Sequence, residues 1–342
     1  LYSSLIASSH LLEDFLDFHG AKNNKNWYFY RELSAAVRHL SMSGYIQEHI
    51  SNRLVFYDLM GIEPFDTEGE ETRTFLRKTL LTLAPVIVSE ATRLEIPVPE
   101  ADFSLADFPS ISSGEMLEFD IDDEQPRQQR RNIVKVTTEF LNVIRDFEEF
   151  GIYEKVSPKE IGELVPEKIN EVVIRRLEML VHNLQSSFDT YILYGGLRYG
   201  NRKLKQLRSY FSVVYHLFDL TGKLLHFYER HFFSPQDGQK STYKSTRDKL
   251  ARYIDEAALL DRIINYGLFY ACHFLSDGKR LAMEILNENI ERGAIEVGIP
   301  VSLGFHSRPS LLVAKITQHY GGEVQLCVGE DEFDASSVLD IQ

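Results

Sequence analysis

Cysteine and long apolar runs are scarce in this 342-residue chain, and each absence excludes a class of protein. The two cysteines, Cys272 and Cys327, lie far apart, so neither a disulfide framework nor a zinc-finger spacing is available. No apolar run reaches the roughly 20 residues of a membrane-spanning helix, and no signal peptide is visible. We therefore predict a cytoplasmic protein with no membrane partner.

Basic residues are also in deficit. The chain has 37 Lys and Arg against 51 Asp and Glu, which gives a net charge of −14. Such a balance argues against a nucleic-acid partner, because binding to phosphate backbones depends on clustered positive charge. The 44% apolar and 26% charged content is typical of a globular protein, and the length allows two domains with cores of their own.

Proline is infrequent over most of residues 1–292, where apolar residues recur with helical period. We predict a mainly α multi-helix bundle there, interrupted at about 95–132, where four prolines and a charged run indicate an irregular segment. No family is recognised in this part. The expected helices are Tyr2–Phe18, Trp27–Met60 with a break near Gly44, Glu70–Leu94, which Pro85 should kink or end early, Ile133–Phe150, a capped helix from Ser157, Pro166–Tyr194, Asn201–Phe233, Ser245–Phe274 and Ser276–Arg292.

A short segment near the C-terminal end combines a histidine, an arginine and a proline: Gly304-Phe305-His306-Ser307-Arg308-Pro309-Ser310. A strand-like run over 294–303 precedes it, and a helical run follows, with Leu311, Leu312, Ile316 and Tyr320 on one face. Proline favours the first position of a helix, so the helix is expected to begin at Pro309. His306 would then lie at a helix N-terminus, where free N–H groups and the helix dipole favour a phosphate.

This segment resembles the Gly-Leu-His-Ala-Arg-Pro signature of HPr, the phosphocarrier of the sugar phosphotransferase system. The resemblance continues through the Gly321-Gly322 helix end, a strand over 323–328, a turn at 329–331 and a second strand through Phe333. The stretch 334–339, Asp-Ala-Ser-Ser-Val-Leu, then resembles the family's Asn-Ala-Lys-Ser-Ile-Met. His306 and Ser337 have the family's spacing between its phosphohistidine and its regulatory serine.

The resemblance implies an α+β open-faced sandwich over residues 293–342, directly after the helical bundle. It covers a small part of the chain and stops before the family's last strand and helix, so we expect the protein to continue past Gln342. Ser336 and Asp340 replace the family's usual lysine and glycine around the serine site.

The resemblance also implies site roles. His306 would accept a phosphoryl group from an Enzyme I-like donor, Arg308 would stabilise its charge, and Ser307 and Pro309 would flank the anion. Ser337 is the candidate for regulatory phosphorylation, and an apolar docking patch would face partner proteins, formed by Leu311, Val338 and Leu339. Two hypotheses follow: a phosphocarrier or phosphorylation sensor with donor and acceptor or regulator partners, or a docking module that transfers nothing and acts through the helical domain.

Histidines and carboxylates also recur in the predicted helix 201–233. His216-x-x-Asp219 and His226-x-x-Glu229 each have i, i+3 spacing, which places each pair on one helix face, and His231 lies beyond them. Di-iron bundles instead use Glu-x-x-His on two facing helices. Because the order is reversed and both pairs share one helix, we interpret these residues as structural histidines, and predict no metal site and no cofactor.

Two further patterns have a structural interpretation. The basic cluster at the start of the same helix could bind an anionic ligand or an acidic surface, but a solvated face is favoured; it consists of Arg198, Arg202, Lys203, Lys205 and Arg208. Cys272-His273 lies in an aromatic helical run, where a buried packing role is expected.

Overall fold

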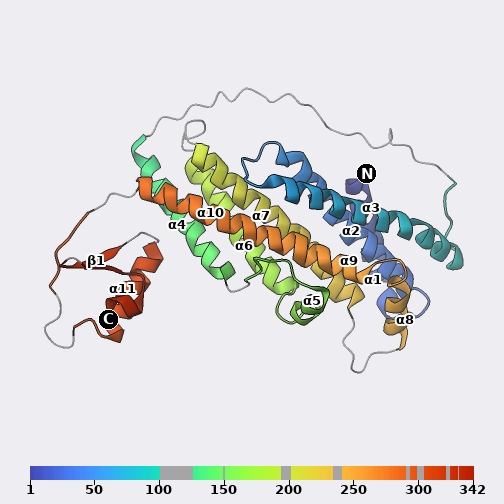
Figure 1. The fold of residues 1–342 in the computed structure, drawn as a ribbon. Helices are drawn as coiled ribbons and strands as arrows, with labels where there is room; N and C mark the ends of the chain where they lie inside the picture. Colours follow the sequence, from blue (N-terminus) through green and yellow to red (C-terminus); the bar gives the residue numbers. More distant parts are fainter. Residues whose placement is uncertain are drawn as a thin grey trace. The chain divides into compact units, whose positions relative to one another are not determined.

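The computed structural model describes residues 1–100, 126–148, 151–193, 202–233, 241–289, 293–298, 304–320, 324–329 and 331–342. Helices dominate these residues, as predicted, and one small sheet lies near the C-terminal end (Figure 1). None of the described helices combines the length and the apolar character that a bilayer crossing requires. The chain divides into two compact units. One comprises Leu1–Asp120, Ile152–Met179 and Ser212–His273, and the other comprises Ile121–Gly151, Leu180–Phe211 and Phe274–Gln342.

The first unit is built around α2 (Tyr28–Leu54), which packs against α1 (Tyr2–Phe18) and α3 (Ile62–Arg93). The prediction for α1 is confirmed, including its end at His19 and Gly20, where Gly20 has a φ of 77°. The other elements with residues in this unit are the 3-10 helix η1 (Ala21–Asn23), α5 (Pro158–Leu164), α6 (Glu171–Phe188), α7 (Arg202–Phe227), the π-helix η4 (Tyr228–Phe232), α8 (Ser241–Leu250), α9 (Glu256–Asp261), the π-helix η5 (Arg262–Leu268) and α10 (Phe269–Asn289).

The predicted break of α2 near Gly44 is wrong. The helix is continuous, and Gly44 is buried where a Cβ would lie 2.5 Å from the ring of Tyr2. The glycine is therefore explained by close packing between helices. The predicted start of the next helix at Glu70 is also wrong, because α3 already begins at Ile62. Pro64 lies in its first turn, where the missing N–H removes no helical hydrogen bond.

The predicted helices on either side of Ser276 also differ from the structure. Residues 251–255 separate α8 from α9, and the Asp255 side chain caps α9 by accepting a hydrogen bond from the Ala258 N–H (3.0 Å). Ser276 begins no helix, because α10 runs through it from Phe269 to Asn289. The capping box predicted at Ser157 is confirmed: its side chain accepts from the Glu160 N–H, and the Glu160 carboxylate accepts from the Ser157 N–H.

The second unit contains α4 (Pro126–Glu148), which begins inside the stretch predicted to be irregular; residues 101–125 of that stretch lie outside the described residues. Its core is aromatic. The rings of Phe140 and Phe188 pack against Phe211 with centroid separations of 6.2 and 5.0 Å. Gly278 of α10 lies so close that a Cβ there would be 2.7 Å from the ring of Phe140. The π-helix η3 (Asp189–Leu193) continues α6 in this unit.

The C-terminal part of this unit contains α11 (Ser307–Tyr320), β1 (Gln325–Val328), β2 (Asp331–Asp334) and α12 (Val338–Ile341) (Figure 1). The predicted hairpin is confirmed: β1 and β2 pair antiparallel, with Gln325 opposite Asp334 and Val328 opposite Asp331. The full sandwich is not shown. Residues 293–298 of the predicted first strand have no regular structure. The sheet in the described residues consists of β1 and β2, so residues 293–298 form no strand of it.

Candidate functional site

The start of α11 is organised by Gly304 and Ser310. Gly304 has a φ of 55°, in the left-handed region that glycine adopts without strain, and turns the chain into the helix. Ser310 is fully buried, and its Oγ donates to the carbonyl oxygens of Phe305 (3.1 Å) and His306 (3.0 Å). The Ser310 N–H also donates to the His306 carbonyl (3.1 Å), which is the first helical hydrogen bond. These contacts fix the backbone on which His306 is carried.

His306, Ser307 and Arg308 are all exposed, while Pro309 is half-buried. The helix begins at Ser307, two residues earlier than predicted, so Pro309 is its third residue. Its missing N–H still falls among the first four donors of a helix, which have no intrahelical partner. The N–H groups of Ser307 and Arg308 belong to the same set. The sequence therefore places an accessible imidazole, a guanidinium and first-turn donors at one helix end.

Ser337 caps α12. Its Oγ accepts a hydrogen bond from the Asp340 N–H (3.3 Å), and its own N–H donates to the Asp334 carbonyl (3.1 Å). The neighbouring Ser336 N–H and hydroxyl both donate to the Asp334 carboxylate at 2.8 Å. Phosphorylation of Ser337 would therefore modify the hydroxyl that caps α12.

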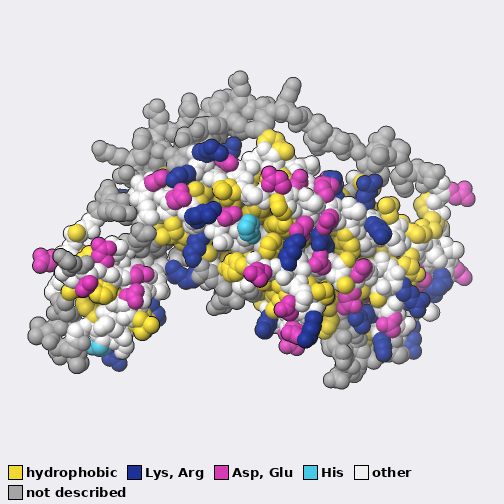
Figure 2. Space-filling view, viewed as in Figure 1, with side chains coloured by type: hydrophobic (Ala, Val, Ile, Leu, Met, Phe, Trp, Pro, Cys, Tyr) yellow, Lys and Arg dark blue, Asp and Glu magenta, His cyan; other side chains and the backbone are white. Residues whose placement is uncertain are grey.

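The apolar side of α11 is exposed. Leu311 and Leu339 of the predicted docking patch are 46% and 82% exposed, and Val338 is half-buried. The helix face that is buried in this part instead consists of small or polar side chains: Ser310, Ala314 and Thr317. Leu311, Leu312 and Ile316, three residues of the apolar face predicted from periodicity, are therefore exposed at the surface of the described part. Acidic side chains gather on the same part (Figure 2), and Asp331, Glu332, Asp334 and Asp340 are exposed there.

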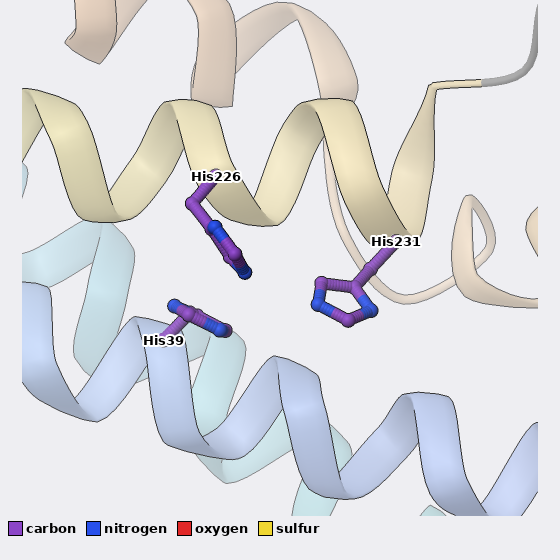
Figure 3. Close-up of side chains that lie close together, drawn as sticks. All are labelled: His39, His226 and His231. Atoms are coloured by element: carbon purple, nitrogen blue, oxygen red, sulfur yellow. The ribbon is translucent and has the colours of Figure 1, made fainter. Parts of the chain in front are cut away.

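A second cluster lies in the first unit and consists of three histidines, His39 from α2, His226 from α7 and His231 from η4 (Figure 3). One ring nitrogen of each lies within 4.8 Å of those of the other two. The rings of His39 and His226 stack with a centroid separation of 4.4 Å. Figure 3 shows all three side chains pointing into the space between α2 and the α7–η4 segment.

The π-helical turn η4 brings two of these histidines to one face. In an α-helix, residues five apart point in directions about 140° apart, because each residue turns the chain by about 100°. In a π-helix the hydrogen bonds run between residues five apart, so residue 231 lies over residue 226. The Phe233 N–H donates to the Tyr228 carbonyl in this pattern. Such turns are frequent at functional sites.

Two carboxylates orient the rings. The Nδ1 of His226 lies 2.8 Å from Oε1 of Glu171, and the Nδ1 of His231 lies 2.8 Å from Oε2 of Glu32. Arg31 Nη1 also approaches His231 Nδ1 at 3.0 Å and donates to Oε1 of Glu32. Arg31 Nη1 can only donate, so Nδ1 of His231 either accepts from Arg31 or donates to Glu32, but not both. The shorter contact is the one with Glu32, and it favours the tautomer in which Nδ1 donates to the carboxylate. We assign the Nδ1–H tautomer to both rings, which leaves each Nε2 with its lone pair.

Two ring nitrogens of the cluster have no protein partner. Nδ1 of His39 and Nε2 of His231 are buried and make no hydrogen bond to the described residues. His39 is 5% exposed, and the His231 side chain is also 5% exposed. Burial lowers the pKa of His39 to about 2, and the charges of His226 and His231 act in the same direction. At neutral pH the His39 ring is therefore uncharged and has a free lone pair.

A polar cavity of about 440 Å³ opens beside the cluster and is lined by residues of the same unit, including His226, His231, Tyr28 and Tyr243. Its wall contains a buried ion-pair network centred on Arg31, which contacts Glu13 and Asp17 at 2.8 Å. Burial lowers the pKa of His226, against the hydrogen bond to Glu171. Burial also disfavours the Glu171 charge, but its contacts with His226, Arg175 and Arg230 hold the pKa of its carboxyl below the ordinary value.

In the structure, His216 and Glu229 of the two sequence pairs contact residues of other helices. The His216 ring packs against His49 (4.5 Å), away from the cluster. Glu229 accepts a hydrogen bond from the Glu171 N–H (2.6 Å). The cluster's third histidine, His39, and its carboxylates, Glu32 and Glu171, were missed. They come from helices far apart in the chain, and no local pattern connects them.

The remaining sequence candidates have structural roles. In the basic cluster, Lys203 pairs with Glu284 (3.1 Å) and Glu288 (2.6 Å), and Arg208 pairs with Asp189 (2.8 Å). Arg198 lies outside the described residues. Cys272 is buried, as expected for a packing role, and burial raises the pKa of its thiol to about 11. The buried role expected for His273 is wrong: its side chain is exposed and stacks on Phe269 (6.2 Å).

Comparison with known proteins gives no relative for this chain: no family model, no curated protein and no solved structure matches it.

Proposed function

We propose that the C-terminal part accepts a phosphoryl group on His306 from an Enzyme I-like donor, as its resemblance to HPr implies. One observation carries this proposal: the His306 imidazole is exposed immediately before α11, beside the exposed Arg308. A buried ring could not reach a donor protein. An exposed one at a helix N-terminus has both access and a favourable field for the anion it would form.

The chemistry requires a lone pair and a place for negative charge. In this proposal Nδ1 of the neutral His306 ring attacks the phosphorus atom, a P–N bond forms, and the bond to the donor's leaving atom breaks with its electron pair. The phosphoryl group adds roughly −1.5 to −2 charges, which the Arg308 guanidinium and the first-turn N–H groups would stabilise. Ser307 and Arg308 supply these N–H groups, and Pro309 supplies none.

The experiment is phosphorylation with phosphoenolpyruvate and purified Enzyme I. We expect acid-labile label on the wild-type chain and none on His306→Ala. His319→Ala is the matched control, because His319 is an exposed histidine on the same helix. Label that persists in His306→Ala, or a folded wild-type chain that takes no label, would contradict the proposal.

The alternative is a docking module that transfers no phosphate, and the exposed apolar and acidic surface favours it. Leu311 and Leu339 are exposed beside acidic residues, which suits a partner with a basic, partly apolar surface. Onward transfer separates the two: a carrier passes its phosphate to an acceptor protein, whereas a docking module passes none. Leu339→Glu would weaken partner binding in either case, so transfer is the deciding measurement.

A further inference from the structure

We propose that His39, His226 and His231 form a binding site for a divalent transition metal, with Zn²⁺ as the best-fitting ion. One ring nitrogen of each histidine converges with the others from α2, α7 and η4 (Figure 3). The cluster also contains two buried ring nitrogens without a hydrogen bond to the described residues, Nδ1 of His39 and Nε2 of His231. Three imidazoles are a ligand set that suits zinc and its neighbours in the first transition row, and excludes the oxygen-seeking Mg²⁺ and Ca²⁺.

The unpartnered nitrogens are the main argument. A buried polar atom without a hydrogen bond costs free energy, so its persistence in a core requires an explanation. One water molecule has two hydrogens to donate, while this cluster offers three ring nitrogens within 4.8 Å of one another. A cation can accept a lone pair from all three.

The carboxylates complete the pattern of a metal site. A histidine that binds a metal through one nitrogen almost always donates the other N–H to a carboxylate, a carbonyl or water, which fixes the tautomer. His226 and His231 do this through Glu171 and Glu32, each at 2.8 Å. Both Nε2 atoms are thereby left as ligands. The negative charges of Glu32 and Glu171 also attract a divalent ion. The positive charges of Arg31 and Arg38 nearby reduce the net attraction between the site and the ion.

The geometry requires a small contraction. With bonds of about 2.0–2.1 Å and tetrahedral angles, ligand nitrogens lie about 3.3 Å apart. The three ring nitrogens lie within 4.8 Å of one another, which allows separations wider than 3.3 Å. Rotation about the side-chain bonds of His39 or His226 would bring the nitrogens to the shorter distance. Three protein ligands leave a fourth position open, which is the arrangement of catalytic rather than structural zinc sites. The cavity lined by His226 and His231 gives that position access to solvent.

The test uses the tag-free full-length chain, freed of metal with a chelator and titrated with Zn²⁺ by calorimetry and with Co²⁺ by visible absorption. We expect one ion per chain and the strong Co²⁺ bands of a four-coordinate site. His226→Ala should lose this binding; its side chain is 26% exposed, so the substitution disturbs the core less than His39→Ala. Glu32→Gln should weaken binding 10- to 100-fold while keeping all three ligands.

His10→Ala is the matched control, since His10 is an exposed histidine of α1 outside the cluster; it should bind as the wild type does. His306→Ala should also bind normally, so this test is independent of the phosphoryl proposal. The metal site is refuted if His226→Ala, shown to be folded by circular dichroism, binds Zn²⁺ as tightly as the wild type. It is also refuted if the folded wild-type chain binds no stoichiometric Zn²⁺ or Co²⁺.

Discussion

The two thiols of the chain should differ sharply in reactivity. Cys272 is buried in α10, and burial raises the pKa of its thiol to about 11, while Cys327 in β1 is exposed. The thiolate is the reactive form, so at pH 8 a rise of two units lowers its population about 100-fold. Restricted access adds to this difference. With a disulfide reagent at pH 8 we expect one thiol to react rapidly and the second at least 100-fold more slowly.

Single-cysteine variants show which thiol gives the fast phase of the reaction and which gives the slow phase. Cys327→Ser should lose the fast phase, and its remaining thiol should react only when denaturant unfolds the chain. Cys272→Ala should keep the fast phase and lose the slow one. If the folded Cys327→Ser chain reacted as fast as a free thiol, Cys272 would not be buried, and the packing of α10 described here would be wrong.

The same pKa shift predicts a pH dependence of stability. A thiol whose pKa is raised in the folded state stabilises the protein below its unfolded pKa, and this contribution is lost as the pH rises from about 9 to 11. Between pH 8 and pH 10 the loss from Cys272 alone is about 1.3 kcal/mol. Denaturant unfolding of wild type and Cys272→Ala at both pH values isolates it, because other groups cancel in the double difference. Equal pH responses of the two chains would refute the reasoning.

Three further predictions concern the helices. Gly278→Ala should destabilise the protein by about 1–3 kcal/mol, since a Cβ would lie 2.7 Å from Phe140. Gly162 is an exposed position of α5 with open space around it, so Gly162→Ala should instead stabilise the protein by about 0.4–1 kcal/mol. Denaturant unfolding measures both changes. Ser157→Ala should cost about 1 kcal/mol by removing the capping box of α5, and Ser157→Asp should recover most of it in the same assay. Arg31→Met should lower the free energy of unfolding by about 3–5 kcal/mol, because it removes the arginine from the buried Glu32 and leaves Glu13 with Arg38 alone; a loss below 1 kcal/mol would show that this network is solvated.

Local signals predicted the elements whose causes are local. Helix α1 ends at His19 and Gly20 because glycine takes the left-handed conformation there, and the sequence shows that glycine directly. The capping box at Ser157 needs only two residues three positions apart. The hairpin of β1 and β2 is likewise encoded by two short strands and a glycine turn, with Gly329 at a φ of 66°.

Predictions failed where a distant part of the chain decides the outcome. Gly44 was interpreted as a helix break, but its cause is the ring of Tyr2, more than 40 residues away in sequence. The apolar periodicity correctly predicted helix α11. It cannot show whether another part of the chain packs over Leu311, Leu312 and Ile316. In the structure they are exposed, and Ser310 and Ala314 are buried in their place.

The histidine cluster shows why the candidate site required coordinates. From the sequence, His226 belonged with Glu229, because i, i+3 spacing defines one face of an α-helix. The chain is not α-helical beyond Phe227, and the π-helical turn pairs His226 with His231 instead. His39 and Glu32, which complete the cluster, lie on α2, almost 200 residues before His226 and His231 in the sequence. Two buried histidine rings with unpaired nitrogens, His39 and His231, are a costly arrangement for packing alone, since apolar side chains of similar volume would fill the space without unpaired nitrogens. That cost is the physical reason to prefer a metal-binding role over the structural one inferred from the sequence.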